Sequence, residues 1–182
     1  MQRALWRLLC VFPVLCVAVG AAQATTVRYM NLSELVRASD TVVLGRAGAH
    51  DSFWQGTRIY TRVEVAVEEV WVGQAPRTRS IDVITLGGVV GTIGQHVEGV
   101  APLPEDAQVV LHLKARSPSE YVPVALAQGV WHVQPPTASG IEPRISRPFP
   151  DRVVFAQGQT AEAAPQTLAQ LKAAILEAAR EP

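Results

Sequence analysis

The residues of this chain that could do chemistry are few, and they are spread along it. The four histidines each stand alone in their segments: His50, His96, His112 and His132. None belongs to a His-Glu-x-x-His zinc helix, although strands could still bring three of them together around a metal. Glu68 and Glu69 are adjacent on an expected strand, so their side chains point to opposite faces and cannot act as a facing acid–base pair. We therefore expect no metal site and no catalytic residue, with an unrecognised metal-dependent hydrolase as an alternative.

The motifs of covalent and nucleotide chemistry are also missing from the sequence. There is no Gly-x-Ser-x-Gly turn that would present a serine nucleophile. The glycine-rich stretch from Gly87 to Gly99 has neither the spacing of a dinucleotide fingerprint nor the Lys-Ser/Thr ending of a phosphate-binding loop. It predicts instead a bulged or kinked strand that turns a barrel corner, or a place where a ligand approaches bare backbone. We expect no cofactor and a protein that is not an enzyme.

Two large aromatic residues and the glycine-rich stretch are the best candidates for binding. The candidate binding residues are Phe53, Trp54, Gly87, Gly88 and His96. The two aromatics stand beside an expected hairpin turn at 55–57, where we expect them to fold over one end of the barrel, with an exposed binding platform as the alternative. Flexible loops on a rigid scaffold are typical of binding sites, so we expect a surface for a protein or peptide partner. The alternative is a carbohydrate or another small ligand that stacks on Trp54 or Trp131.

The elements that must position these residues are organised around two long strands, expected at 41–50 and 59–72. Residues 59–67 alternate between apolar and polar side chains, which is the period of a strand with one buried face. The alternation breaks at Glu68 and Glu69, after which the apolar side chains fall on even positions. Such a break predicts a bulge, which bends a strand in its middle. Because a bent long strand lets a small sheet close on itself, we expect an all-β fold with a closed OB-like barrel.

Two helices and several shorter strands are expected to complete the fold. Asn31 and Glu34 predict a capping box at the start of a short N-terminal helix. Thr167 and Gln170 predict another for an amphipathic C-terminal helix, which reaches Arg180 and is expected to seal one opening of the barrel. The shorter strands are expected at 81–86, 108–114, 121–126, 129–133 and, at an edge, 152–155.

The first 24 residues predict a secretory signal. Arg3 and Arg7 precede an apolar run from Leu8 to Val19, and small residues allow cleavage near Ala24. A membrane anchor is the alternative, but the run is short for one. Export would place the protein in the periplasm or outside the cell, without a membrane attachment. We expect three parts: the signal (1–24), the barrel with its short helix (25–156), and a linker with the C-terminal helix (157–182).

Cysteine content and charge restrict the kinds of partner. Cys10 and Cys16 leave with the expected signal, so the mature chain can form no disulfide and must rely on its hydrophobic core. The 16 basic and 16 acidic residues of the whole chain balance, and loss of Arg3 and Arg7 leaves 14 basic against 16 acidic residues. No run of basic residues is present. Because nucleic-acid binding depends on clustered lysine and arginine, we expect no nucleic-acid partner.

The strand pattern also carries a family resemblance. It consists of the opening strand at 40–46, the long strand Ile59–Trp71 followed by Val72-Gly73, and the strand at 109–113 behind an acidic turn. From Asp40 to Val133 the chain resembles the netrin-like domain, the OB-type barrel of the tissue inhibitors of metalloproteinases, as in uncharacterised secreted bacterial proteins. Those inhibitors chelate the protease zinc with an N-terminal cysteine, which the expected mature chain lacks. The resemblance therefore implies the fold, keeps a protease among the expected partners, and transfers no functional residue.

Overall fold

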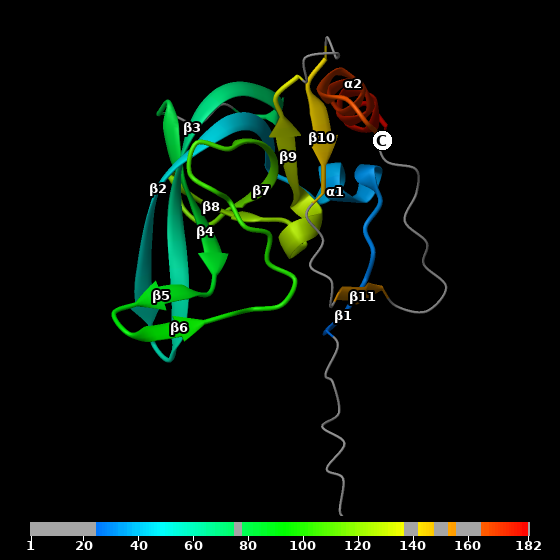
Figure 1. Cartoon of the computed structure of the whole chain (residues 1–182). Helices are drawn as coiled ribbons and strands as arrows, with labels where there is room; N and C mark the ends of the chain where they lie inside the picture. The colour runs from blue at the N-terminus through cyan, green and yellow to red at the C-terminus, as the bar shows by residue number, and fades with distance from the viewer. Residues whose placement is uncertain (1–24, 75–77, 137–141, 148–152, 156–164, 182) are drawn as a thin grey trace, which may run out of the picture.

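The computed structural model describes residues 25–74, 78–136, 142–147, 153–155 and 165–181. The expected signal, 1–24, and most of the expected linker lie outside these residues. In these ranges the fold is mostly β, with two α-helices (Figure 1). The strands are β1 (Thr25–Val27), β2 (Thr41–Gln55), β3 (Arg58–Gly73), β4 (Ser80–Leu86), β5 (Gly88–Val90), β6 (Ile93–Gln95), β7 (Gln108–Ala115), β8 (Glu120–Pro123), β9 (Val130–Gln134), β10 (Arg144–Ser146) and β11 (Val153–Phe155). The helices are α1 (Leu32–Ala38) and α2 (Leu168–Ala178), with a 3-10 turn η1 (Leu126–Gly129).

β2 and β3 form a long antiparallel hairpin, and β2 is longer than expected because it continues to Gln55. Their register shifts in three places. One shift lies opposite Leu44 and Gly45 and leaves Glu68 as the extra residue, so the predicted bulge is confirmed. A Cβ atom at Gly45 would lie 2.7 Å from the carbonyl oxygen of Ala66. Glycine therefore allows the two strands to approach closely at the bend.

The main sheet has seven strands in the order β10-β9-β7-β2-β3-β4-β8. β8 pairs with β4 in parallel and also with β7 in the antiparallel sense. The pairings therefore run from β7 through β2, β3, β4 and β8 back to β7, a ring of five strands. Figure 1 shows the strong curvature of β2 and β3 that this arrangement needs. β1 and β11 form a separate parallel pair.

Two hydrophobic cores lie on opposite faces of β2 and β7. Val43, Leu111 and Leu113 belong to an inner core enclosed by the strand ring. The residues that alternate with them along the strands, such as Val42 and Val110, belong to an outer core. This outer core also contains Trp71, Trp131, Leu171 and Ile175. Helix α2 thus packs across the outside of the sheet. The expectation that it seals an opening of a barrel is wrong, because its apolar stripe matches the apolar outer face of β2, β7 and β9.

Both predicted capping boxes are present. The Asn31 Oδ1 atom accepts from the N–H of Glu34 at 2.8 Å, and the Glu34 carboxylate accepts from the N–H of Asn31 at 3.0 Å. Thr167 and Gln170 make the same reciprocal pair at the start of α2. Neither α1 nor α2, the α-helices of the described ranges, has the length and apolar character that a membrane span requires.

Two expected strands take other forms. The glycine-rich stretch is neither a bulge nor a corner of the main sheet, because among the described strands β5 and β6 pair only with each other, as a short separate hairpin. Gly91, at φ +61, lies in its turn. The strand expected at 121–126 ends at Pro123, where Ala125 and Leu126 adopt left-handed backbone angles before η1. Proline cannot donate to a strand ladder, which explains the early end.

Candidate functional site

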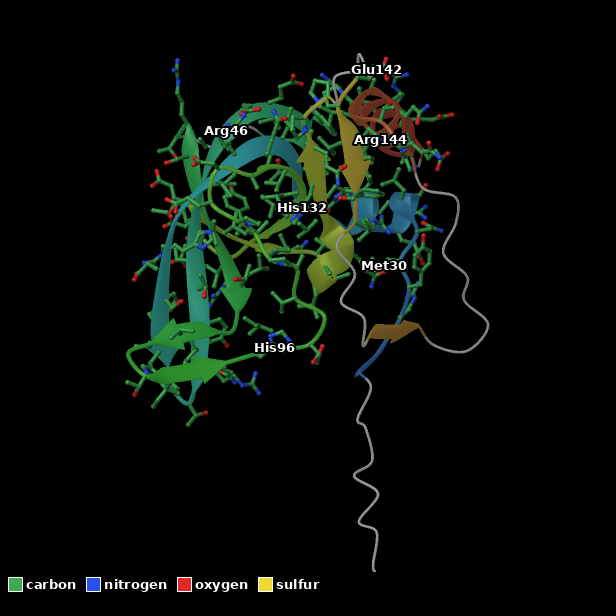
Figure 2. All side chains as sticks on the ribbon, in the orientation of Figure 1. Met30, Arg46, His96, His132, Glu142 and Arg144 are labelled. Atoms are coloured by element: carbon green, nitrogen blue, oxygen red, sulfur yellow. The ribbon has the colours of Figure 1, made fainter. Side chains whose placement is uncertain are left out.

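An open hollow of about 620 Å³ lies between the β2–β3 hairpin, the β5–β6 hairpin and the segment that follows β6. Of the five predicted binding residues, Gly87, Gly88 and His96 line it, whereas Phe53 and Trp54 do not. His50, Thr61 and Gln95 also line it; the sequence did not single them out as binding residues, because their convergence depends on how β5–β6 folds back. Figure 2 shows His96 in the segment that leaves β6.

Polar side chains attach the β5–β6 hairpin to β3. The N–H of Gly87 donates to the Ile59 carbonyl at 2.8 Å, and the Thr61 hydroxyl donates to the Gly87 carbonyl at 2.7 Å. The N–H of Ile59 donates to Gln95 Oε1 at 2.6 Å. A Cβ atom on Gly88 would lie 2.3 Å from the Thr61 hydroxyl oxygen. The glycine pair is therefore needed for close contact with protein side chains, and it also forms part of the wall of the hollow.

This end of the molecule exposes apolar side chains. The large hydrophobic residues that stand out as exposed in the described ranges are Trp54, Val89 and Ile93, with exposed fractions of 45%, 65% and 54%. Trp54 lies on β2 near the hairpin turn, and the other two lie on β5 and β6. Figure 1 shows β5 and β6 beside the lower end of the β2–β3 hairpin. Trp54 is thus an exposed side chain and does not fold over a barrel end.

Phe53 has a role in the sheet surface. Its ring stacks on Tyr60 of the neighbouring strand with centroids 6.1 Å apart, and the Arg62 guanidinium lies 5.2 Å from its centre. Arg62 is held in turn by Asp82 at 3.4 Å and Glu120 at 3.3 Å. Because Phe53 is half-buried among these groups, it is less accessible to a partner than Trp54 is.

The histidines and the paired glutamates have separate environments. His50 and His96 face the hollow and are exposed, His132 Nε2 lies 2.8 Å from the Pro102 carbonyl oxygen, and His112 is fully buried. In the ranges that the structure describes, no three His, Cys, Asp or Glu side chains are grouped as metal ligands would be. Glu68 contacts Arg46 and Gln108. The pKa of Glu69 is lowered, chiefly by a hydrogen bond from Lys172 and to a smaller extent by one from Trp71.

Trp131, the second tryptophan considered as a stacking surface, is buried at 2% exposure. It packs in the outer core, and the Arg147 guanidinium covers its ring at 4.0 Å. A sugar ring cannot reach it, so only Trp54 of the two can offer a stacking face. No known family model, curated protein or solved structure matches this chain.

Proposed function

We propose that this protein is a non-catalytic binding module that recognises a protein or peptide partner. The binding surface is the tip surface, which we define as the exposed side chains Trp54, Val89 and Ile93 at this end of the molecule together with His96, which lines the 620 Å³ hollow. The observation that carries the proposal is the grouping of the exposed large apolar side chains at one end of the described structure. Exposed apolar groups beside a concave, polar-rimmed surface are typical of protein–protein recognition.

The proposed scaffold is a closed OB-like barrel, as in netrin-like domains, and the ring of five paired strands supports this interpretation. A rigid sheet would present the tip surface with little loss of conformational entropy on binding. We propose that the module works after export, in the periplasm or outside the cell, where a protease is one of the partners to be tested.

Substitution at the tip surface tests this function. The protein, exported and processed by its own cell and then purified, is immobilised and exposed to the exported proteins of the same cells. We expect a Trp54→Ser, Ile93→Ser double variant to lose a partner that the unchanged protein retains, because it removes much of the exposed apolar area. The matched control is Glu177→Ser on the exposed side of α2. Retention of every partner by the double variant would contradict the proposal.

A second candidate function is carbohydrate binding, which the 45% exposed ring of Trp54 favours. Aromatic rings present a flat apolar face that stacks on sugar rings. A glycan array read together with tryptophan fluorescence separates the two functions, since a sugar that stacks on Trp54 should change its emission. Trp54→Phe should keep part of such binding, whereas Trp54→Ser should abolish it.

A further inference from the structure

β8 separates from β4 at a point set by one residue. The two strands are paired at only two positions, Asp82–Glu120 and Val83–Tyr121. The N–H of Asp82 donates to the Ser119 carbonyl at 2.9 Å, and alternate residues of a strand face the same edge, so residues 119, 121 and 123 of the chain face β4. The next N–H that β8 would offer belongs to Pro123, which has none. The ladder therefore ends there and leaves a gap between the strands, which we call the seam.

β4 continues along the seam with a free edge. The N–H of Gly87 donates to the Ile59 carbonyl on β3, so the odd-numbered residues of β4 bond to β3, and Ile84 and Leu86 direct their main-chain groups toward the seam. Within the described ranges, the pairing of β4 with β8 stops at Val83–Tyr121, so Leu86 lies beyond the last paired position on this edge. Unpaired main-chain groups on a strand edge can pair with an added chain.

An apolar cavity of about 310 Å³ opens at the same place. Its apolar walls come from β3, β4, β8, η1 and β9: Tyr60, Ile84, Leu86, Val122, Leu126 and Val130. Leu126 reaches the wall through a left-handed backbone angle of +57°, which non-glycine residues rarely adopt. Because walls surround the cavity on several sides, it suits an apolar group at the end of a chain better than a chain that passes through.

Arg116 supplies the charged side chain of this lining. It is exposed, and its guanidinium makes no ion pair or hydrogen bond with another described residue. A guanidinium binds a carboxylate through two parallel hydrogen bonds. An apolar cavity, an open strand edge and an unpaired cation therefore lie together.

We propose that the seam binds the free C-terminal end of an extended peptide. The last apolar side chain of the peptide fills the cavity, its main chain pairs with Leu86, and its terminal carboxylate binds Arg116. A fatty acid would match the cavity and Arg116 but would leave the Leu86 groups unpaired, which favours a peptide. The inference rests on the proposed function, since it names the class of partner; the seam shares Thr85, Leu86, Val100 and Ala101 with the hollow of the tip surface.

Calorimetry on the full-length protein tests this proposal with a pool of short N-acetylated peptides that end in valine, leucine, isoleucine or phenylalanine. We expect the free acids to bind and C-terminal amidation to weaken them roughly 10- to 100-fold, the range for a hydrogen bond to a charged group. Arg116→Gln should weaken the free acids by a similar factor and leave the amides unchanged. Arg37→Gln, an exposed arginine of α1, is the matched control. Amide NMR shifts should move at Leu86.

Several results would overturn the seam proposal. Equal affinity of acids and amides would show that Arg116 does not bind the terminal carboxylate. No binding by the peptide pool, or binding of decanoate in its place, would show that the seam does not bind a peptide. The double variant Trp54→Ser, Ile93→Ser separates the two proposals, because it should leave pool binding intact. A partner that this variant loses but Arg116→Gln keeps would support the tip surface and reject the seam.

Discussion

At the scale of single residues, the position of the β5–β6 hairpin depends on Gly88. A Cβ atom there would lie 2.3 Å from the Thr61 hydroxyl oxygen and 2.5 Å from that of Ser52, and the backbone angle φ is +136°. These two hydroxyls also lie 2.9 Å apart in a hydrogen bond. The local sequence shows a run of glycines, but only the fold shows which glycine touches β2 and β3.

Gly88→Ala should therefore lower the free energy of unfolding by roughly 2–4 kcal/mol, since it adds backbone strain and disrupts the hydroxyl pair. Gly91→Ala in the same hairpin is the control. Its φ is +61° with no atom within 4 Å of an added Cβ, so it should cost about 1 kcal/mol. Urea unfolding measures both, and equal losses would show that the collision does not matter.

His112 is the residue whose burial should shape the pH dependence of stability. Burial lowers its pKa to about 3, and the positive charge of Arg147 adds to the effect. In the unfolded chain the pKa of this residue is near 6.5. Between these two pKa values His112 is therefore protonated in the unfolded chain and neutral in the folded chain. The stability it contributes is thus complete above pH 6.5 and is lost as the pH falls toward 3, by up to about 1.4 kcal/mol per pH unit.

His112→Leu should flatten this acid dependence, because leucine fits the buried site and does not titrate. Urea unfolding between pH 7 and pH 4 compares the slopes of the free energy of unfolding. His50→Leu, at an exposed position, should keep the slope of the unchanged protein. A slope that survives in His112→Leu would show that other groups dominate the acid response.

At the scale of elements, α2 is a structural cover for the outer face of the sheet. Leu171 and Ile175 are fully buried against β2, β7 and β9 residues, and Lys172 reaches Glu69 on β3 at 2.5 Å. Leu171→Ala should lower the free energy of unfolding by about 2–5 kcal/mol through the lost burial and the cavity left behind. Leu176→Ala, on the half-buried side, should cost clearly less. Similar losses in thermal or urea unfolding would contradict this packing.

At the scale of the whole molecule, the two cores share their strands. β2 and β7 contribute alternate residues to the inner and outer cores, so neither core can unfold while the other keeps its sheet. We expect one cooperative transition in urea. Tryptophan fluorescence, which reports the outer core through Trp71 and Trp131, should superimpose on far-ultraviolet circular dichroism, which reports the strands. A fluorescence change at lower urea would show that α2 and the outer core open separately.

Local patterns in the sequence were sufficient for the elements with a clear physical signature. The alternation at 59–67, its break beside Glu68, and both capping boxes predicted a long bulged strand and two helix starts, because these features depend on neighbours a few residues apart. The glycine-rich composition of residues 87–99 placed Gly87, Gly88 and His96 among the candidate binding residues, and these three residues line one hollow. Phe53 was included because it is large and aromatic, which does not distinguish a binding ring from one packed on Tyr60.

Only the tertiary structure decided which faces and edges meet. The stripe of α2 was evident in the sequence, but its docking on the outer face depends on the alternation of β2 and β7 together. The seam follows from Pro123, yet a proline in a strand reveals a gap only when the neighbouring strand, here β4, is known. Local patterns are set by the chemistry of adjacent residues, whereas sites are set by contacts between residues far apart in the chain, and this is why the elements could be derived first and the surfaces only from the fold.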